Sequence, residues 1–289
     1  DESQVVAGYD NSDVRRWKIE DGQQQGQTMK AGGRVHSIAA SQDGRWIVSG
    51  DNGSKAIVWN ALTNEKVHHT ECGNYVYAVD ISSDCTKVVA ASYTGITSNV
   101  QLSGISSGTE LLSPLSHGVV VGVKFSPDGS CFATASCYSG VRVYSTHDGK
   151  ILFDSGTRGS TNSSTPLAWS SDGQQLCIAS QGKITSFNIS DSWSSEWSIH
   201  AGSPVSIASN GRFIACSAGS SVSLWDCMSQ KQIAGFITHS TMVKHIALSP
   251  SGVYLACGVG NSITVHDLRD VLPSKYFVRG VSELRHCAT

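Results

Sequence analysis

The chain carries little charge and no long apolar run. Of its 289 residues 15% are charged, the formal net charge is −2, and lysine and arginine form no basic run. Binding to a nucleic-acid backbone needs clustered lysine and arginine, so we expect no nucleic-acid partner. No apolar run approaches the roughly eighteen residues of a membrane span, and no signal peptide is visible. We therefore expect no membrane partner.

Helical periodicity and paired cysteine motifs are also missing. No segment of ten residues has a convincing helical period. The nine cysteines form no Cys-x-x-Cys pair, which argues against structural zinc, and their odd number leaves at least one thiol unpaired. Cys177, Cys216 and Cys257 fall where small buried residues are expected, a pattern typical of a reducing compartment. These features predict a cytoplasmic protein.

What the sequence does contain is a repeat with a period near forty residues. Successive copies of a tryptophan-like position are 42, 44, 41, 43, 38 and 41 residues apart. Such a fixed period indicates one supersecondary unit used repeatedly. The recurring positions are Trp17, Trp59, Ser103, Tyr144, Phe187, Trp225 and His266.

Each repeat combines a turn with short β-branched runs. The turn is best seen in Ser126-Pro127-Asp128-Gly129, where Asp and Pro pre-set the turn dihedrals and Gly tolerates positive φ. An alternating segment such as residues 35–40 comes before the turn, and apolar runs such as residues 46–48 and 56–59 follow it. This pattern predicts antiparallel strands. The equivalent turns are residues 41–44, 82–85, 126–129, 170–173, 208–211 and 249–252.

These repeats resemble those of the WD-repeat β-propeller family. The match is closest at Leu224-Trp225-Asp226, at His266-Asp267, and at residues 125–129 with the run 132–135 that follows. The resemblance covers essentially the whole chain. It implies an all-β fold in which each repeat is a four-stranded antiparallel blade, with strands a to d from the channel outward. Seven anchors then give a seven-bladed ring, and residues 1–289 form a single propeller domain.

The two ends of the sequence predict how the ring closes. Residues 4–9 look like a second strand and residues 14–19 like a third, so the innermost strand of the first blade is missing at the N-terminus. Residues 281–286 have the spacing of residues 35–40. We predict that the C-terminal strand 281–286 joins the N-terminal blade, which removes an open sheet edge. Because the chain starts at Asp1 and not at Met, we expect a piece of a longer protein.

The repeats depart from the family pattern in specific places. The resemblance implies a buried hydrogen-bonded set of His, Asp, Ser or Thr, and Trp in each blade. The His remains only at His117 and His239, and the Asp is mostly replaced, for example by Asn261. Ser103 stands where an aromatic residue is expected, so the third blade should be the least well supported.

Three motifs suggest chemistry that their setting does not favour. Residues 104–108 spell the Gly-x-Ser-x-Gly elbow of serine hydrolases but fall between strands c and d, where Gly and Ser are ordinary turn residues. Residues 50–55 lack the Gly-Lys-Ser/Thr order of a phosphate loop. The ten histidines do not cluster at metal-ligand spacing, and His68 and His69 point to opposite faces of a strand. We expect no catalytic residue, metal or cofactor.

The resemblance places the b–c and d–a connections on one rim, called here the top rim. Aromatic and Arg side chains there are the favoured partner-binding residues, because these types most often anchor protein interfaces. Asp80, Lys124 and Arg285 are expected along the channel, and residues 154–165 as a polar loop with nothing to bury. For His117 the interpretation as a buried structural residue is also open. The rim candidates are Tyr9, Arg34, Asn74, Tyr75, Tyr93, His117, Tyr138 and Met242.

We therefore predict a non-catalytic scaffold that binds a protein or peptide and is monomeric as an isolated domain. The degenerate repeats and Ser-rich turns resemble the C-terminal propellers of large fungal signalling proteins with a NACHT-type nucleotide-binding domain, which implies a sensor or regulatory module. An assembly or substrate-receptor subunit, such as a ubiquitin-ligase adaptor, is the alternative. A propeller hydrolase with a channel site is a minor alternative, because few carboxylates reach the predicted channel mouth.

Overall fold

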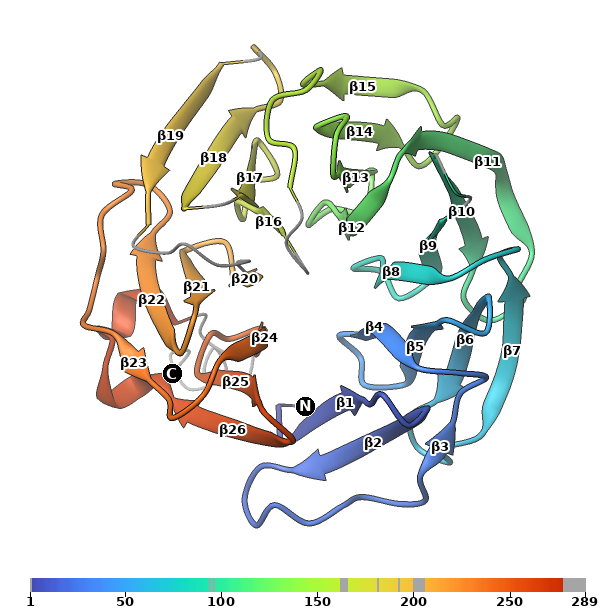
Figure 1. Cartoon of the computed structure of the whole chain (residues 1–289), viewed down its shortest axis with the longest axis horizontal. Helices are drawn as coiled ribbons and strands as arrows, with labels where there is room; N and C mark the ends of the chain where they lie inside the picture. The colour runs from blue at the N-terminus through green and yellow to red at the C-terminus, as the bar shows by residue number, and fades with distance from the viewer. Residues whose placement is uncertain are drawn as a thin grey trace, which may run out of the picture.

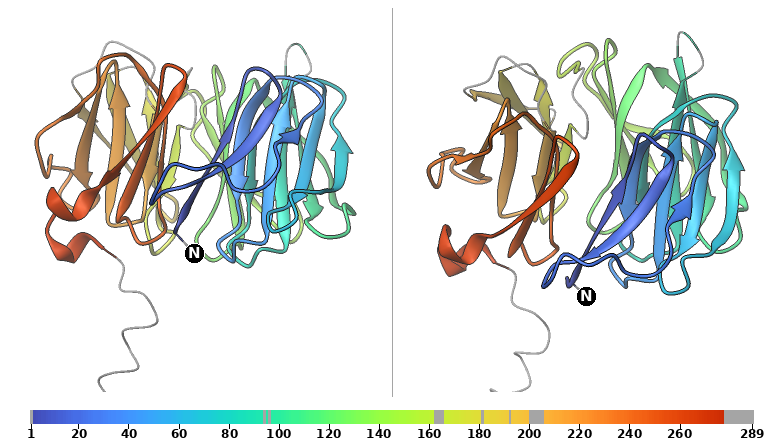
Figure 2. Two further views of the ribbon diagram at one scale, coloured as in Figure 1. Left: turned by 90° about the horizontal axis from the view of Figure 1, so that it is seen from below. Right: turned by 60° about the horizontal axis from the view of Figure 1, so that its bottom comes forward.

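The protein is a ring of seven antiparallel sheets around a central channel (Figure 1). The computed structural model describes residues 2–93, 95, 97–161, 166–180, 182–191, 193–199 and 206–277. Within these residues five sheets have four strands, and the first and last sheets have three. Figure 2 shows that the strands run across the thickness of the ring. The prediction of an all-β, seven-bladed propeller is confirmed.

The first four blades follow one another along the chain. The first contains β1 (Gln4–Gly8), β2 (Asp13–Lys18) and β3 (Met29–Lys30). The second contains β4 (Val35–Ala40), β5 (Trp46–Asp51), β6 (Lys55–Asn60) and β7 (Lys66–Glu71). The third contains β8 (Val76–Ile81), β9 (Lys87–Tyr93), β10 (Thr97–Gly104) and β11 (Glu110–Gly118). The fourth contains β12 (Val120–Phe125), β13 (Cys131–Ser136), β14 (Val141–Ser145) and β15 (Ile151–Asp154).

The remaining three blades complete the ring. The fifth contains β16 (Leu167–Trp169), β17 (Gln175–Ser180), β18 (Lys183–Asn188) and β19 (Ser194–Ser198). The sixth contains β20 (Ser206–Ser209), β21 (Phe213–Ala218), β22 (Ser221–Asp226) and β23 (Ile237–Thr238). The seventh contains β24 (Val243–Leu248), β25 (Tyr254–Val259) and β26 (Ser262–Asp267). Two short 3₁₀ helices follow, η1 (Leu268–Asp270) and η2 (Ser274–Tyr276).

The seven recurring positions are structurally equivalent. Each lies on strand c of its blade and faces an apolar residue of strand b, as in the pairs Ile47 with Trp59 and Ile214 with Trp225. Even His266 keeps this register, opposite Leu255. A deviation occurs next to Ser103, where the pairing of β10 with β11 shifts register. Ser103 itself is buried, and the lower stability expected for the third blade stays a prediction.

The a–b turns share one hydrogen-bonded design. In four of them the Ser hydroxyl donates to the Asp two residues later, with Oγ–Oδ1 distances of 2.5–2.6 Å. The same Ser oxygen accepts the backbone N–H that begins strand b, as in Trp46 to Ser41 at 2.9 Å. These bonds fix the hairpin and explain why the Ser-x-Asp pattern repeats. The four pairs are Ser41 with Asp43, Ser82 with Asp84, Ser126 with Asp128, and Ser170 with Asp172.

Among the residues that the structure describes, the hydrophobic core is divided into six clusters, each between two consecutive blades. One example joins Val58 of the second blade to Val79 and Val88 of the third. Within the described residues no such cluster joins the seventh blade to the first. There, Ser251 donates from its backbone N–H to Glu2 at 2.5 Å, and its hydroxyl donates to the same carboxylate. Polar contacts therefore connect the two blades at this seam.

The chain after β26 differs from the expected fourth strand of the seventh blade. Residues 268–276 contain η1 and η2, and Leu268, Leu272 and Tyr276 are buried in the core of the sixth and seventh blades. The hydroxyl of Tyr276 donates to Asp226 at 2.8 Å, and Arg212 donates to the carbonyl oxygen of Phe277 at 2.7 Å. The apolar spacing of four residues favours this compact turn over a strand.

Ring closure by residues 281–286 lies outside the described residues, so this part of the fold prediction stays a prediction. Figure 2 shows that β1 starts from the same rim on which η1 and η2 lie. The two ends of the described chain thus lie on the same rim of the ring.

Candidate binding surface

Four aromatic side chains gather on the top rim over the second and third blades. The His36 and Tyr77 rings are 4.9 Å apart between centroids, and Tyr75 lies 6.4 Å from each of them. Tyr93 extends the group, with its ring 6.2 Å from that of Tyr77. The Tyr75–Tyr77 and Tyr77–Tyr93 pairs are edge-to-face, a favoured geometry for aromatic pairs. We call His36, Tyr75, Tyr77 and Tyr93 the aromatic cluster.

The position of this cluster follows from β-bulges at the start of the innermost strands. In β4, Val35 pairs with Asp51 and Ser37 with Gly50, which leaves His36 as an extra residue. In β8 the extra residue is Tyr77, between Val76 and Ala78. Bulges bend a strand and re-aim a side chain, and they are frequent at rims. Equivalent bulges in β12 and β24 set Val121 and Lys244 at the same level.

Backbone hydrogen bonds hold the cluster in place. The N–H of Tyr93 donates to the carbonyl oxygen of Tyr75 at 2.9 Å. The N–H of Tyr75 also donates to its neighbour Asn74 Oδ1 at 2.8 Å, and the Tyr93 hydroxyl donates to the carbonyl of Gly95. Tyr75 is 44% exposed despite these restraints. The backbone at Tyr75 and Tyr93 is therefore held in place while the Tyr75 ring stays accessible.

An ion pair stands beside the cluster. Arg34 Nε lies 2.8 Å from Asp10 Oδ1, and both side chains are largely exposed. Burial, and then the positive charge of Arg34, lower the pKa of His36. Because the ordinary His value is near 6.5, the His36 ring is neutral at pH 7 and can act as an apolar and hydrogen-bonding surface.

Tyr9 has an internal role as well as a rim position. Its hydroxyl accepts a hydrogen bond from Trp17 Nε1 at 2.9 Å, and Arg15 lies 5.2 Å from its ring centroid. The ring is half-buried. Tyr9 thus supplies the first blade with the oxygen that Ser49 supplies to Trp59 in the second, also at 2.9 Å.

His117 is wrong as a partner-binding candidate, because it is only 2% exposed. Its Nδ1 lies 2.8 Å from Thr134 Oγ1, and its Nε2 lies 3.2 Å from the carbonyl oxygen of Ser139. The interpretation as a buried structural histidine is confirmed. Burial, despite the hydrogen bond to the Ser139 carbonyl, lowers the pKa of His117.

Tyr138 and Met242 lie on the same rim but apart from the cluster. They are 72% and 52% exposed. Among the described residues no ring contact joins Tyr138 to another aromatic side chain. The structure therefore brings together Tyr75 and Tyr93 of the predicted set, adds His36 and Tyr77, and leaves Tyr138 and Met242 isolated. Both missed residues are the second residue of strand a, and the bulge that re-aims them is visible only in the strand pairing.

The loop predicted at residues 154–165 is described as far as Thr161, and the expectation that nothing in it is buried is wrong. Ser155 and Thr161 are 6% and 3% exposed. The Ser155 hydroxyl accepts the N–H of Val141 at 2.8 Å, and the Thr161 hydroxyl donates to the carbonyl of Ala179 at 2.6 Å. Polar side chains can be buried here because each finds a backbone partner.

Asp80 and Lys124, the two described channel positions, make structural contacts. Asp80 is buried and its Oδ1 lies 2.8 Å from Lys124 Nζ, while its Oδ2 accepts the N–H of Phe125 at 2.8 Å. This contact ties the third blade to the fourth. Arg285 lies outside the described residues.

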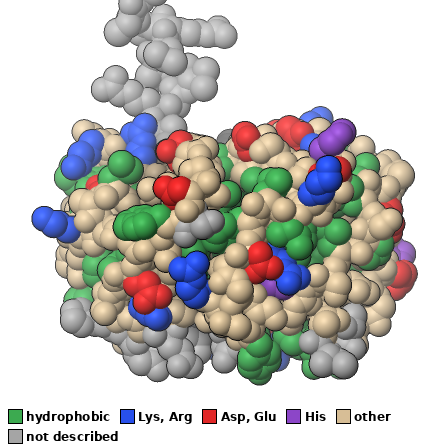
Figure 3. Space-filling view, turned by 90° about the horizontal axis from the view of Figure 1, so that it is seen from above, with side chains coloured by type: hydrophobic (Ala, Val, Ile, Leu, Met, Phe, Trp, Pro, Cys, Tyr) green, Lys and Arg blue, Asp and Glu red, His purple; other side chains and the backbone are tan. Residues whose placement is uncertain are grey.

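The motifs that suggested enzymes are turns. Residues 104–108 connect β10 to β11, with the N–H of Gly108 donating to the carbonyl of Gly104 at 2.9 Å. Residues 51–55 connect β5 to β6, and Asp51 Oδ1 accepts the N–H of Lys55 at 3.1 Å. The charged side chains on the side of the ring in Figure 3 are of mixed sign and interspersed with hydrophobic ones. The described side chains on that face form no basic patch.

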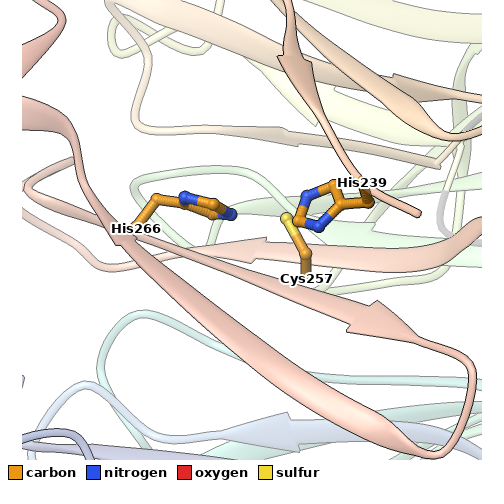
Figure 4. Close-up of side chains that lie close together, drawn as sticks. All are labelled: His239, Cys257 and His266. Atoms are coloured by element: carbon orange, nitrogen blue, oxygen red, sulfur yellow. The ribbon is translucent and has the colours of Figure 1, made fainter. Parts of the chain in front are cut away.

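The histidine pattern needs one correction. His68 and His69 make separate contacts, with the Ile105 carbonyl and with Glu71. The fold, however, brings potential ligand atoms of His239, Cys257 and His266 within 4.8 Å of one another, which their spacing in the sequence did not indicate (Figure 4).

In the part of the chain that the structure describes, no helix has both the length and the apolar character that a membrane span needs.

Comparison with known proteins agrees with this architecture. Residues 23–60, 108–145 and 230–267 match the family described as WD domain, G-beta repeat. A WD repeat-containing protein, SL1-17, from Schistosoma mansoni is 28% identical over 120 residues. This match covers 41% of the chain and 39% of that relative. The chain thus spans about two fifths of the length of the curated relative it matches.

Proposed function

Because the chain is a seven-bladed WD-repeat β-propeller, we propose that it is a non-catalytic scaffold that binds a protein or peptide on its top rim. The aromatic cluster is the observation that carries this proposal. Tyrosine is enriched among the residues that anchor protein interfaces. Here His36, Tyr75, Tyr77 and Tyr93 form a connected set at the rim, and Arg34 and Asp10 supply polar groups beside it.

The restricted motion of the aromatic cluster favours binding. Bulges and backbone hydrogen bonds fix the backbone at the four residues, and contacts between the rings restrict the side chains, so little entropy is lost on association. Propellers present such rims on a rigid ring, and WD-repeat propellers in general bind proteins or peptides.

We place this scaffold in the cytoplasm, as a sensor or regulatory module of a larger signalling protein. The eight described cysteines are all free, which supports a reducing compartment. The regulatory role rests on the resemblance of the degenerate, Ser-rich repeats to propellers of NACHT-type signalling proteins.

A capture experiment with defined variants tests the rim. The intact chain is immobilised beside the double variant Tyr75→Ala/Tyr77→Ala, and the affinity of each captured protein is then measured with purified components. We expect the double variant to weaken binding at least about 30-fold, since two anchor residues are removed. The matched control is Tyr138→Ala/Met242→Ala, which removes two exposed rim residues outside the cluster and should change affinity less than about threefold.

Both variants must first show the melting temperature of the parent chain. A partner that binds the cluster variant as tightly as the parent would overturn the assignment of the aromatic cluster. Turnover of a substrate by the intact chain would overturn the non-catalytic function.

A further inference from the structure

Three side chains with metal-binding chemistry meet between the sixth and seventh blades. His239 lies just after β23, Cys257 lies on β25 and His266 on β26. One potential ligand atom from each lies within 4.8 Å of the other two. Figure 4 shows the two imidazole rings and the thiol turned toward a common point. The ring centroids of the two histidines are 5.1 Å apart.

The equivalent positions in other blades hold hydrogen-bonded pairs. In the second blade Trp59 Nε1 donates to Ser49 at 2.9 Å, and in the fourth blade His117 contacts Thr134 at 2.8 Å. Cys257 has the register of Ser49, two residues after the residue that faces the anchor position. His266 correspondingly has the register of Trp59. The seventh blade thus places ligand-forming side chains where others place a structural hydrogen bond.

No such hydrogen bond replaces them here. Nε2 of His239 and Nε2 of His266 are buried atoms without a hydrogen-bond partner among the described residues. A buried polar atom without a partner has lost its hydrogen bonds to water without replacing them, so such atoms usually indicate a missing partner. A single bound cation would give both Nε2 atoms a partner and would also contact the nearby Cys257 thiol.

We propose that His239, Cys257 and His266 form a zinc-binding site. Imidazole nitrogen and thiolate sulfur are the ligands that zinc prefers. Bond lengths of about 2.0–2.1 Å to nitrogen and about 2.3 Å to sulfur require ligand atoms about 3.3–3.6 Å apart in a tetrahedron. Small side-chain rotations bring the ligand atoms, which lie within 4.8 Å of one another, to this separation. The His239 and His266 side chains are partly exposed, although their Nε2 atoms and Cys257 are buried.

The site would cross-link the chain at its least regular part. It joins the segment after β23 in the sixth blade to β25 and β26 in the seventh, the blade whose chain continues as η1 and η2. Because the three ligands converge only in the folded ring, zinc binds the folded state and stabilises it.

Metal titration of the intact, untagged, reduced and metal-free chain tests this directly. We expect one Zn²⁺ per chain, a raised melting temperature that returns to its starting value with chelator, and a thiolate-to-metal charge-transfer band with Co²⁺ as probe. Absence of stoichiometric Zn²⁺ binding at micromolar concentration would overturn the proposal.

Two single variants locate the site. Cys257→Ser removes the thiolate at nearly constant size, and His266→Trp installs the residue found at this position in three other blades. Each should weaken Zn²⁺ binding about 100-fold or more, and Cys257→Ser should abolish the Co²⁺ charge-transfer band. The control His147→Ala/Cys137→Ser removes an imidazole and a thiol elsewhere and should leave both signals unchanged. Unchanged Zn²⁺ affinity in Cys257→Ser and His266→Trp would place the metal elsewhere and refute the site.

Discussion

The carboxylate of Glu2 accepts two hydrogen bonds from Ser251, which lies 249 residues further along the chain. Ser251 stands at the turn position that Asp occupies in four other blades, for example Asp43 and Asp128. At this seam the carboxylate comes instead from the first segment of the chain. The contact joins the seventh blade to the first, where the described residues form no shared hydrophobic cluster.

Removal of this carboxylate should weaken the ring at its seam. We expect Glu2→Ala to lower the free energy of unfolding by about 1–2 kcal/mol, because two charge-assisted hydrogen bonds are lost. Urea denaturation measures the change. Glu65→Ala, at an exposed position of a c–d turn, is the matched control and should stay within about 0.5 kcal/mol of the parent. Equal stabilities of the two variants would contradict the role of Glu2.

Deletion of residues 281–289 tests the predicted closing strand. If residues 281–286 complete the first blade, the truncated chain exposes a sheet edge and should melt well below the full chain. Differential scanning calorimetry gives both melting temperatures. A truncated chain that melts within about one degree of the full chain would show that the ring does not depend on this strand.

Acid should destabilise the a–b turns. Partial burial alone would raise the pKa of Asp43, but hydrogen bonds from Ser41 and Arg45 outweigh it and lower that pKa to about 2. The pKa of Asp84 is lowered in the same way, and hydrogen bonds from Ser126 lower that of Asp128. A carboxyl with a lowered folded-state pKa stabilises the protein above its unfolded value near 3.9, and this contribution is lost as pH falls from there toward the folded value.

We therefore expect the free energy of unfolding to fall steeply between about pH 4 and pH 2. Denaturant titrations across this range measure the slope. Asp43→Asn should reduce stability at pH 7 and flatten the pH dependence, whereas Asp270→Asn, at an exposed position without such a turn, should leave the slope unchanged. An unaltered slope in Asp43→Asn would argue against this origin of acid sensitivity.

Asp80, the buried carboxylate in the channel, should contribute more to the free energy of unfolding than its ion-pair partner Lys124. Asp80→Ala leaves the N–H of Phe125 without its partner, so we expect a loss of about 2–3 kcal/mol. Lys124 is half exposed, and Lys124→Ala should cost about 1 kcal/mol or less. Chemical denaturation measures the stability loss of each variant and shows which loss is larger. A larger loss for Lys124→Ala would mean that the ion pair, and not the backbone hydrogen bond, dominates.

Cysteine alkylation should follow burial. Desolvation raises the pKa of Cys177 to about 11 and those of Cys216 and Cys227 to about 12. Cys137 is only partly buried. Because the thiolate is the reactive form, iodoacetamide should modify Cys137 at least about tenfold faster than Cys216 in the folded chain. Peptide mass spectrometry quantifies each site, and urea should remove the difference. Similar rates without urea would contradict the buried positions.

The regular part of the fold could be predicted from the sequence, since it depends on local signals. Ser-x-Asp-Gly turns and β-branched runs are set by residues of one blade, and the period near forty residues repeats that unit along the chain. Together they predicted the strands and the anchor positions. Three features depend on contacts that no local signal reports. These are the extra residues His36 and Tyr77 at the bulges, the meeting of His239 with Cys257 and His266, and the burial of Thr161 through a distant carbonyl.

At the inner-strand bulges, the residues available to a partner differ from the residues that pair the strands. His36, Tyr77, Val121 and Lys244 are the residues that their ladders skip, so the paired residues on either side keep their register whatever side chain stands there. A lineage could exchange these four positions and acquire a new partner while the blades remain intact. The rim is thus free to diversify in evolution at little cost to the ring that supports it.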